Sequence, residues 1–100
     1  MLRHDSVVFL ADTFRLLGDG SRLAILFTCA GAPLNVGAIA AATGLSASLV
    51  SHHLRLLRAA RIVRSDRRGR NVYYALADDH VARMLADMTA HVGEDDEASA

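Results

Sequence analysis

The chain has 100 residues, enough for one small domain with only a thin core. Because 52% of the residues are hydrophobic, which is a high share for a small monomer, we expect a dimer. The formal net charge is zero, which by itself argues weakly against a nucleic-acid-binding protein. The single cysteine, Cys29, excludes an intrachain disulfide and paired-cysteine metal or redox motifs. The sequence contains no apolar segment long enough for a membrane span, and its first apolar run is too short for a signal peptide. We therefore expect a cytoplasmic protein.

The charges are unevenly distributed along the chain. Seven of the eleven basic residues, all arginines, lie in residues 55–70, where Asp66 is the only acid. Four of the eleven acidic residues form the run 94–97. Because a basic patch attracts a polyanion even when the summed charge is zero, this distribution restores nucleic acid as a candidate partner.

The first half of the chain reads as helices. A helix is predicted over 6–17, and one of its faces is apolar: Val7, Leu10, Phe14 and Leu17. The glycines around Asp19 end it, and Ser21 is the predicted N-cap of a second helix that ends at Gly31. A short helix over 36–44 follows.

A helix-turn-helix motif is predicted where the short helix meets the next one. Gly44 supplies the turn, and Ser46 caps a helix of about 13 residues. Its apolar side contains Val50, Leu54 and Leu57, and its polar side contains Ser48, Ser51, His52 and Arg55. Small polar side chains followed by arginine suit a helix that enters a DNA groove. The alternative is a solvated surface helix.

Two β-rich runs, 61–66 and 71–76, follow this helix and are separated by RRGR, in which Gly69 supplies the turn. Such a hairpin is a wing, and its tip carries Arg67, Arg68 and Arg70, which suit phosphate or minor-groove contacts. Ordinary solvation of the tip is the alternative. The predicted fold is therefore mainly α with a two-stranded β wing (α+β), one winged helix-turn-helix domain over 1–100.

The last predicted helix, 79–92, has side chains near both ends that can ligate a metal: Asp78, His80, His91 and Glu94. The two histidines are separated by about 16 Å along a helix axis at roughly 1.5 Å per residue, too far to share one ion. Antiparallel pairing with a second copy would bring the start of one helix to the end of the other and create two equal sites.

Two imidazoles and two carboxylates suit tetrahedral Zn²⁺, and Co²⁺ could replace it. Four protein ligands leave no open position for catalysis. The alternatives are that Asp78 or Asp79 is only a helix N-cap and that the two histidines are partly exposed surface residues. Glu94 could likewise belong only to an acidic tail, 93–100, which we expect to be disordered. Asp87 is a possible substitute ligand or supporting partner.

The sequence resembles the ArsR/SmtB family of metal-responsive repressors over nearly all of residues 8–94. The resemblance rests on FRLLGDGSRLAIL (14–26), SLVSHHLRLLRAARIV (48–63), RRGRNVYYAL (67–76) and the four-residue ligand pattern described above. It implies a homodimer whose metal-free form binds operator DNA and represses metal-efflux or storage genes, while metal binding lowers DNA affinity.

The resemblance also assigns residues. It places Ser48, Ser51 and His52 in the DNA groove and the three arginines of the wing tip on DNA, and we add Ser46 and Arg55 to this predicted DNA-binding set. It implies a dimer interface between the first and last helices, to which we assign Val7, Leu10, Val81, Leu85 and Met88. In many relatives the helix-turn-helix carries metal-binding cysteines, but here Asn35 and Gly37 occupy those positions, and we expect Cys29 to be a buried apolar residue.

Among possible metals Zn²⁺ ranks first. Relatives that sense Ni²⁺ or Co²⁺ add ligands from their termini, and this chain offers only His4 and Asp5 near its start. An enzyme is not expected, because HExxH, a phosphate-binding glycine loop and GxSxG are all missing from the sequence. A winged-helix regulator with a non-metal signal and a dimerisation module without a DNA role remain as alternatives.

Overall fold

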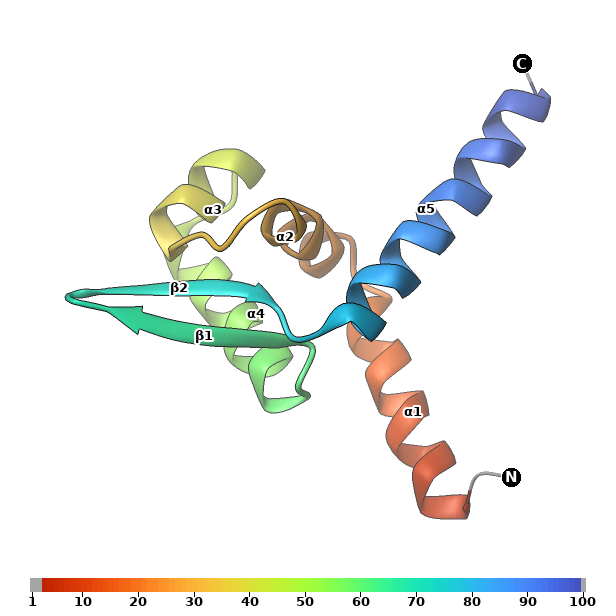
Figure 1. The fold of residues 1–100 in the computed structure, drawn as a ribbon, viewed down its shortest axis with the longest axis horizontal. Helices are drawn as coiled ribbons and strands as arrows, with labels where there is room; N and C mark the ends of the chain where they lie inside the picture. The colour runs from red at the N-terminus through yellow and green to blue at the C-terminus, as the bar shows by residue number, and fades with distance from the viewer. Residues whose placement is uncertain (1–2, 100) are drawn as a thin grey trace.

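The structure, a computed structural model, describes residues 3–99 and the side chains through residue 93. Figure 1 shows the elements, which are α1 (His4–Leu17), α2 (Gly20–Ala30), α3 (Val36–Thr43), α4 (Ala47–Ala59), β1 (Val63–Arg68), β2 (Asn71–Leu76) and α5 (Asp79–Ser99). The hairpin and α2–α4 form one body, and α1 and α5 project from this body on the side away from the hairpin tip (Figure 1). The predicted winged helix-turn-helix is confirmed.

The core lies where α2, α3 and α4 meet the base of the hairpin. Its largest fully buried side chains are Ile25, Leu26, Ile39, Leu54, Leu57, Val50 and Cys29. Burial raises the pKa of the Cys29 thiol to about 11, so the group remains protonated at neutral pH. The prediction that this cysteine is a buried apolar residue is confirmed.

The starts of the helices depend on capping side chains. Ser46 Oγ accepts a hydrogen bond from the backbone N–H of Leu49 at 3.1 Å, as predicted for an N-cap. In α2 the prediction was wrong, because the N-cap is Asp19 and Ser21 lies inside the helix. The Asp19 carboxylate accepts from the backbone N–H of Arg22 at 2.9 Å, and this hydrogen bond holds the Asp19 pKa below its usual range. A carboxylate also interacts favourably with a helix N-terminus, which a serine hydroxyl cannot match.

The hairpin begins two residues later than predicted, because α4 ends with an additional turn. Arg61 adopts a positive φ of 61°, and the N–H of Ile62 bonds back to the Leu57 carbonyl at 2.9 Å. The strands then pair antiparallel from Val63 with Leu76 to Arg68 with Asn71. A two-residue turn remains at the tip, with Gly69 at a φ of 64°.

The two projecting helices leave much apolar surface uncovered. Exposed apolar side chains on them are Val7, Val8, Phe9, Leu10, Phe14, Met88 and Val92. The radius of gyration is 14.7 Å, above the roughly 13 Å typical of a compact domain of this length. None of the helices over residues 3–99 is long and apolar enough to cross a membrane.

α5 is longer than predicted, and its assigned interface residues differ in exposure. Its helical backbone continues to Ser99, whereas we expected the helix to end at 92 and the segment from 93 to be disordered. Leu85, assigned to the dimer interface, is only 6% exposed and belongs to the core of the protomer. Val81 is half-buried against the same core, while Met88 is 55% exposed. Leu85 therefore packs largely within its own protomer, and its assignment to the dimer interface stays a prediction.

Replacing Gly44 by alanine should destabilise the fold by about 1–2 kcal/mol, because Gly44 ends α3 in the left-handed region at a φ of 76°. An added Cβ would meet nothing within 4 Å, so the cost is one of backbone conformation. The matched control is Gly37→Ala inside the same helix, which should be neutral or stabilising by up to about 1 kcal/mol. Urea unfolding followed by circular dichroism measures both variants. Equal effects of the two substitutions would contradict the account of the turn.

Candidate nucleic-acid interface and metal centre

The polar side of α4 is available to a ligand outside the protomer. Ser46, Ser48, His52 and Arg55 are exposed, and Ser51 is half-buried. Val50, Leu54 and Leu57 anchor the opposite side in the core. The helix therefore presents hydroxyl, imidazole and guanidinium groups from a fixed support, and such groups read base edges and bind phosphates in a major groove.

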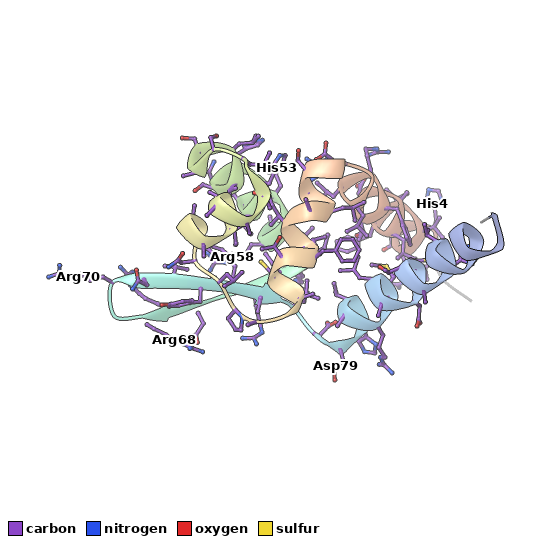
Figure 2. The ribbon with its side chains drawn as sticks, turned by 90° about the horizontal axis from the view of Figure 1, so that it is seen from above. His4, His53, Arg58, Arg68, Arg70 and Asp79 are labelled. Carbon is purple, nitrogen blue, oxygen red and sulfur yellow. The ribbon has the colours of Figure 1, made fainter. Side chains whose placement is uncertain are left out.

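The wing tip is also exposed, but its arginines differ. Arg70 lies at the far end of the hairpin (Figure 2). Arg68 Nε lies 3.2 Å from the Asp66 carboxylate, and its guanidinium lies 5.4 Å from the centre of the Tyr73 ring. Arg67 Nε donates to the carbonyl of Gly69 at 3.4 Å. Arg68 is the one held by a side-chain acid, so a phosphate would have to compete with that ion pair.

A groove of about 450 Å³ separates α4 from the wing. Its lining is contributed by α4 and β2 and consists of Ser51, Leu54, Arg55, Arg58, Ala59 and Tyr74. Arg58 lies one turn beyond the predicted DNA-binding positions and is exposed (Figure 2). Two guanidinium groups therefore lie beside a hollow between α4 and the wing. Such groups suit the phosphates of the DNA backbone that separates a major groove from the neighbouring minor groove. We did not predict Arg58 as a DNA-binding residue, because its place beside this groove depends on where the wing packs against α4.

The four candidate metal ligands are not brought together within one protomer. Among the described residues, no group of three or more His, Cys, Asp or Glu side chains could hold a metal ion. Asp78 precedes α5, and its Oδ1 accepts the backbone N–H of Val81 at 3.0 Å, so it is a helix cap. His80 and His91 are exposed on the same continuous helix. The side chain of Glu94 lies outside the described residues.

One contact in this region involves a candidate ligand. His80 Nδ1 lies 3.4 Å from Nη2 of Arg83, one turn further along α5. Asp87, the possible substitute ligand, is exposed. His4, the other candidate for an additional ligand, begins α1 and is also exposed (Figure 2).

An apolar groove of about 470 Å³ runs between α1, α2 and α5. Its lining comprises Phe14, Leu17, Gly18, Leu23, Phe27, Met84, Leu85, Met88, Thr89 and Val92. The assigned interface residues Val7 and Leu10 are exposed on α1, which contributes to this groove. An apolar surface of this kind indicates a contact with another protein chain.

A helix-turn-helix with a polar recognition helix, followed by an arginine-tipped wing, defines a winged helix-turn-helix DNA-binding protein. The model of the bacterial regulatory protein arsR family matches residues 19–65. A transcriptional repressor SmtB homolog from Synechocystis is 44% identical over 92% of this chain and 70% of its own length. The chain belongs to the ArsR family, and it is a transcriptional regulator and not an enzyme.

Solved structures agree with this assignment. The homodimeric winged helix-turn-helix DNA-binding domain of a possible ArsR-family regulator from Mycobacterium bovis matches with a TM-score of 0.87 and 30% identity, over 98% of this chain and 93% of that chain. The solution structure of apo-NmtR matches with a TM-score of 0.79 and 38% identity, over 94% of this chain and 79% of that chain. The regulator NmtR from Mycobacterium tuberculosis is 43% identical over 81% of this chain and 68% of its own length.

Replacing Arg58 by alanine should weaken DNA binding through the phosphate backbone, without changing sequence preference. We expect the slope of log K against log salt concentration to fall by about 0.9, the value for one lost phosphate contact. Fluorescence anisotropy at several salt concentrations, with metal removed by a chelator, measures this slope. The matched control is Arg83→Ala on α5, which removes the same charge and should leave the slope unchanged. An unchanged slope for Arg58→Ala would exclude Arg58 from the interface.

Proposed function

We propose that the protein is a metal-sensing transcriptional repressor that works as a homodimer. In this proposal the metal-free dimer binds operator DNA through α4 and the wing. Metal binding at two equal sites between the subunits lowers operator affinity and restores expression of metal-resistance or efflux genes. Family membership supports operator binding, and the SmtB homolog and NmtR are the relatives that favour a metal as the signal.

The observation that carries the inter-subunit site is the continuity of α5. A single helix from Asp79 to Ser99 keeps His80 and His91 apart along its axis, so one chain cannot use both histidines for one ion. Both are exposed, and Asp78 immediately precedes the helix. Antiparallel packing of two α5 helices would bring Asp78 and His80 of one chain to the His91 and Glu94 end of the other.

The donor set fits Zn²⁺, which takes four nitrogen and oxygen ligands in a tetrahedral site. Asp78 uses one carboxylate oxygen as a cap, and a carboxylate can offer its second oxygen to a metal. Neutral imidazole has a single acceptor nitrogen, so metal coordination by His80 requires its contact with Arg83 to break. Co²⁺ and Ni²⁺ are the second candidates, with additional ligands such as His4 or Asp87.

Dimerisation is favoured by the uncovered apolar faces of α1 and α5. Leu10→Glu should weaken the dimer more than about a hundredfold, because an uncompensated buried charge costs roughly 3 kcal/mol or more. The matched control is Leu49→Glu on α4, since the two leucines are 41% and 39% exposed in the protomer. Sedimentation equilibrium separates the two outcomes. A Leu10→Glu protein that remains as strongly dimeric as the control would argue against an α1 interface.

His91→Ala should abolish the response to metal while leaving operator binding intact. We expect the wild-type protein to bind one Co²⁺ per chain with intense visible absorption bands, displaced by Zn²⁺, as a tetrahedral nitrogen and oxygen site requires. The variant should lose these bands, and adding metal should no longer change its operator affinity. His4→Ala serves as the control and should behave like the wild type for a Zn²⁺ site.

Three results of that titration would change the proposal. A normal metal response in His91→Ala would remove His91 from the site. Weak Co²⁺ bands with tight binding would indicate higher coordination and favour Ni²⁺ or Co²⁺ as the signal. Operator binding without any tight metal binding would favour the second candidate function, a winged-helix regulator with another signal, which is consistent with the helix-capping role of Asp78.

A further inference from the structure

One buried polar side chain is used by neither the DNA interface nor the candidate metal site. His53 lies on α4 next to His52 (Figure 2), but its side chain is buried and only 7% exposed. It is the only polar or charged residue among the buried residues of the described part of the chain. A histidine in such a place is normally held by a specific partner.

The partner of His53 is Arg22 on α2. Arg22 Nη1 lies 3.4 Å from His53 Nδ1. A guanidinium carries only donors, so Nδ1 must be the unprotonated acceptor and the ring proton must lie on Nε2. Arg22 Nε also donates to the Leu16 carbonyl at 2.6 Å, and its backbone N–H donates to Asp19.

These bonds join three elements at one arginine. Leu16 belongs to the last turn of α1, Arg22 to the first turn of α2 and His53 to the middle of α4. α1 carries the uncovered apolar face, and α4 carries the polar face that meets DNA. The angle between these two helices decides how the two recognition helices of a dimer would be spaced along a duplex.

We propose that the Arg22–His53 hydrogen bond is a positioning contact that holds α4 in its DNA-binding orientation, and that protonation of His53 releases it and lowers operator affinity. The proposal rests on operator binding by the dimer and is independent of the metal site. Protonation would place a hydrogen on Nδ1, so that two donors and two cations would face each other in a buried position. The hydrogen bond cannot persist in that state.

The surroundings of His53 favour its neutral form. Burial lowers its pKa from 6.5, Arg22 and His52 lower it further, and Asp19 opposes them. Two further elements, α3 and β1, pack against α4. α3 carries no charged residue, and the charged side chains of β1, which are Arg64, Asp66, Arg67 and Arg68, are all exposed. Because the pKa of the closed state lies below that of a released histidine, the open state binds more protons as the pH falls through 6.5. The closed state is therefore favoured above pH 6.5 and loses stability below it.

Positive charge on the exposed neighbour His52 would change DNA affinity in the opposite direction, so this residue provides an internal control. Its imidazole lies on the DNA side of α4, 5.7 Å from the His53 ring between centroids. Positive charge at His52 would lie near the phosphates and could only raise DNA affinity. A fall in affinity on acidification therefore cannot come from His52.

The test measures operator affinity against pH for the metal-free dimer in a chelating buffer. The probe is a fluorescein-labelled duplex that the protein itself selects from a randomised library at pH 7.5. Between pH 7.5 and 5.5 the wild-type affinity should fall by about tenfold, since uptake of one proton changes a binding constant by up to that factor per pH unit. His53→Asn should remove this fall, because its amide oxygen can accept from Arg22 but cannot be protonated.

Two further variants separate a pH-sensitive positioning contact from a merely structural one. Arg22→Gln removes the cation but keeps a donor, so the midpoint of the affinity loss should move to higher pH. His52→Asn should steepen the loss. Circular dichroism at each pH confirms that the protein remains folded.

The proposal is overturned if the wild-type affinity does not fall on acidification, or if His53→Asn loses affinity as the wild type does. If His53→Asn does not fold, an unchanged midpoint in Arg22→Gln overturns it equally. Failure to select any duplex at pH 7.5 would contradict operator binding itself, and the proposal with it.

Discussion

The uncovered apolar surface of α1 and α5 is the constraint on which the rest of the structure depends. A chain of 100 residues builds its core from α2, α3, α4 and the base of the hairpin, and that core uses only one edge of each projecting helix. The apolar residues left over, such as Phe9 at 61% exposed, cost free energy in water. A second copy of the chain can cover them, and pairing two chains through these helices would fix the spacing of the two DNA-binding faces.

One of the candidate metal ligands, Asp78, lies next to the base of the wing. β2 ends at Leu76 and α5 begins at Asp79, so Asp78 lies in the short link between the wing and the projecting helix. The N–H of Ala77 in the same link bonds to the Ile62 carbonyl, just before β1, at 3.0 Å. A ligand that draws Asp78 towards a partner helix would therefore pull on the base of the wing. If metal and DNA are coupled as proposed, the coupling is reciprocal, and typical values of 1–3 kcal/mol change affinity by about 5–150-fold.

Local patterns in the sequence predicted much of this structure. The cap at Ser46, the turn at Gly44 and the two-strand wing follow from local chemistry that needs no knowledge of distant residues. Tertiary packing decided the rest. Leu85 has the spacing of an interface residue but is buried by its own protomer, and Arg58 and His53 gain their surroundings only when the wing and α2 pack against α4. The proposed metal site depends on the packing of two chains, which local patterns in one sequence do not determine.

The most direct test of the inter-subunit site is complementation between two inactive chains. One chain carries Asp78→Ala and His80→Ala, and the other carries His91→Ala and Glu94→Ala, so neither homodimer should bind Co²⁺ tightly. In a mixed dimer, one site loses all four ligands and the other regains the full set. We therefore predict one tightly bound Co²⁺ per mixed dimer, with the absorption spectrum of the wild type. A mixed dimer that binds no metal, or a single variant that already binds as the wild type does, would contradict a site shared between subunits.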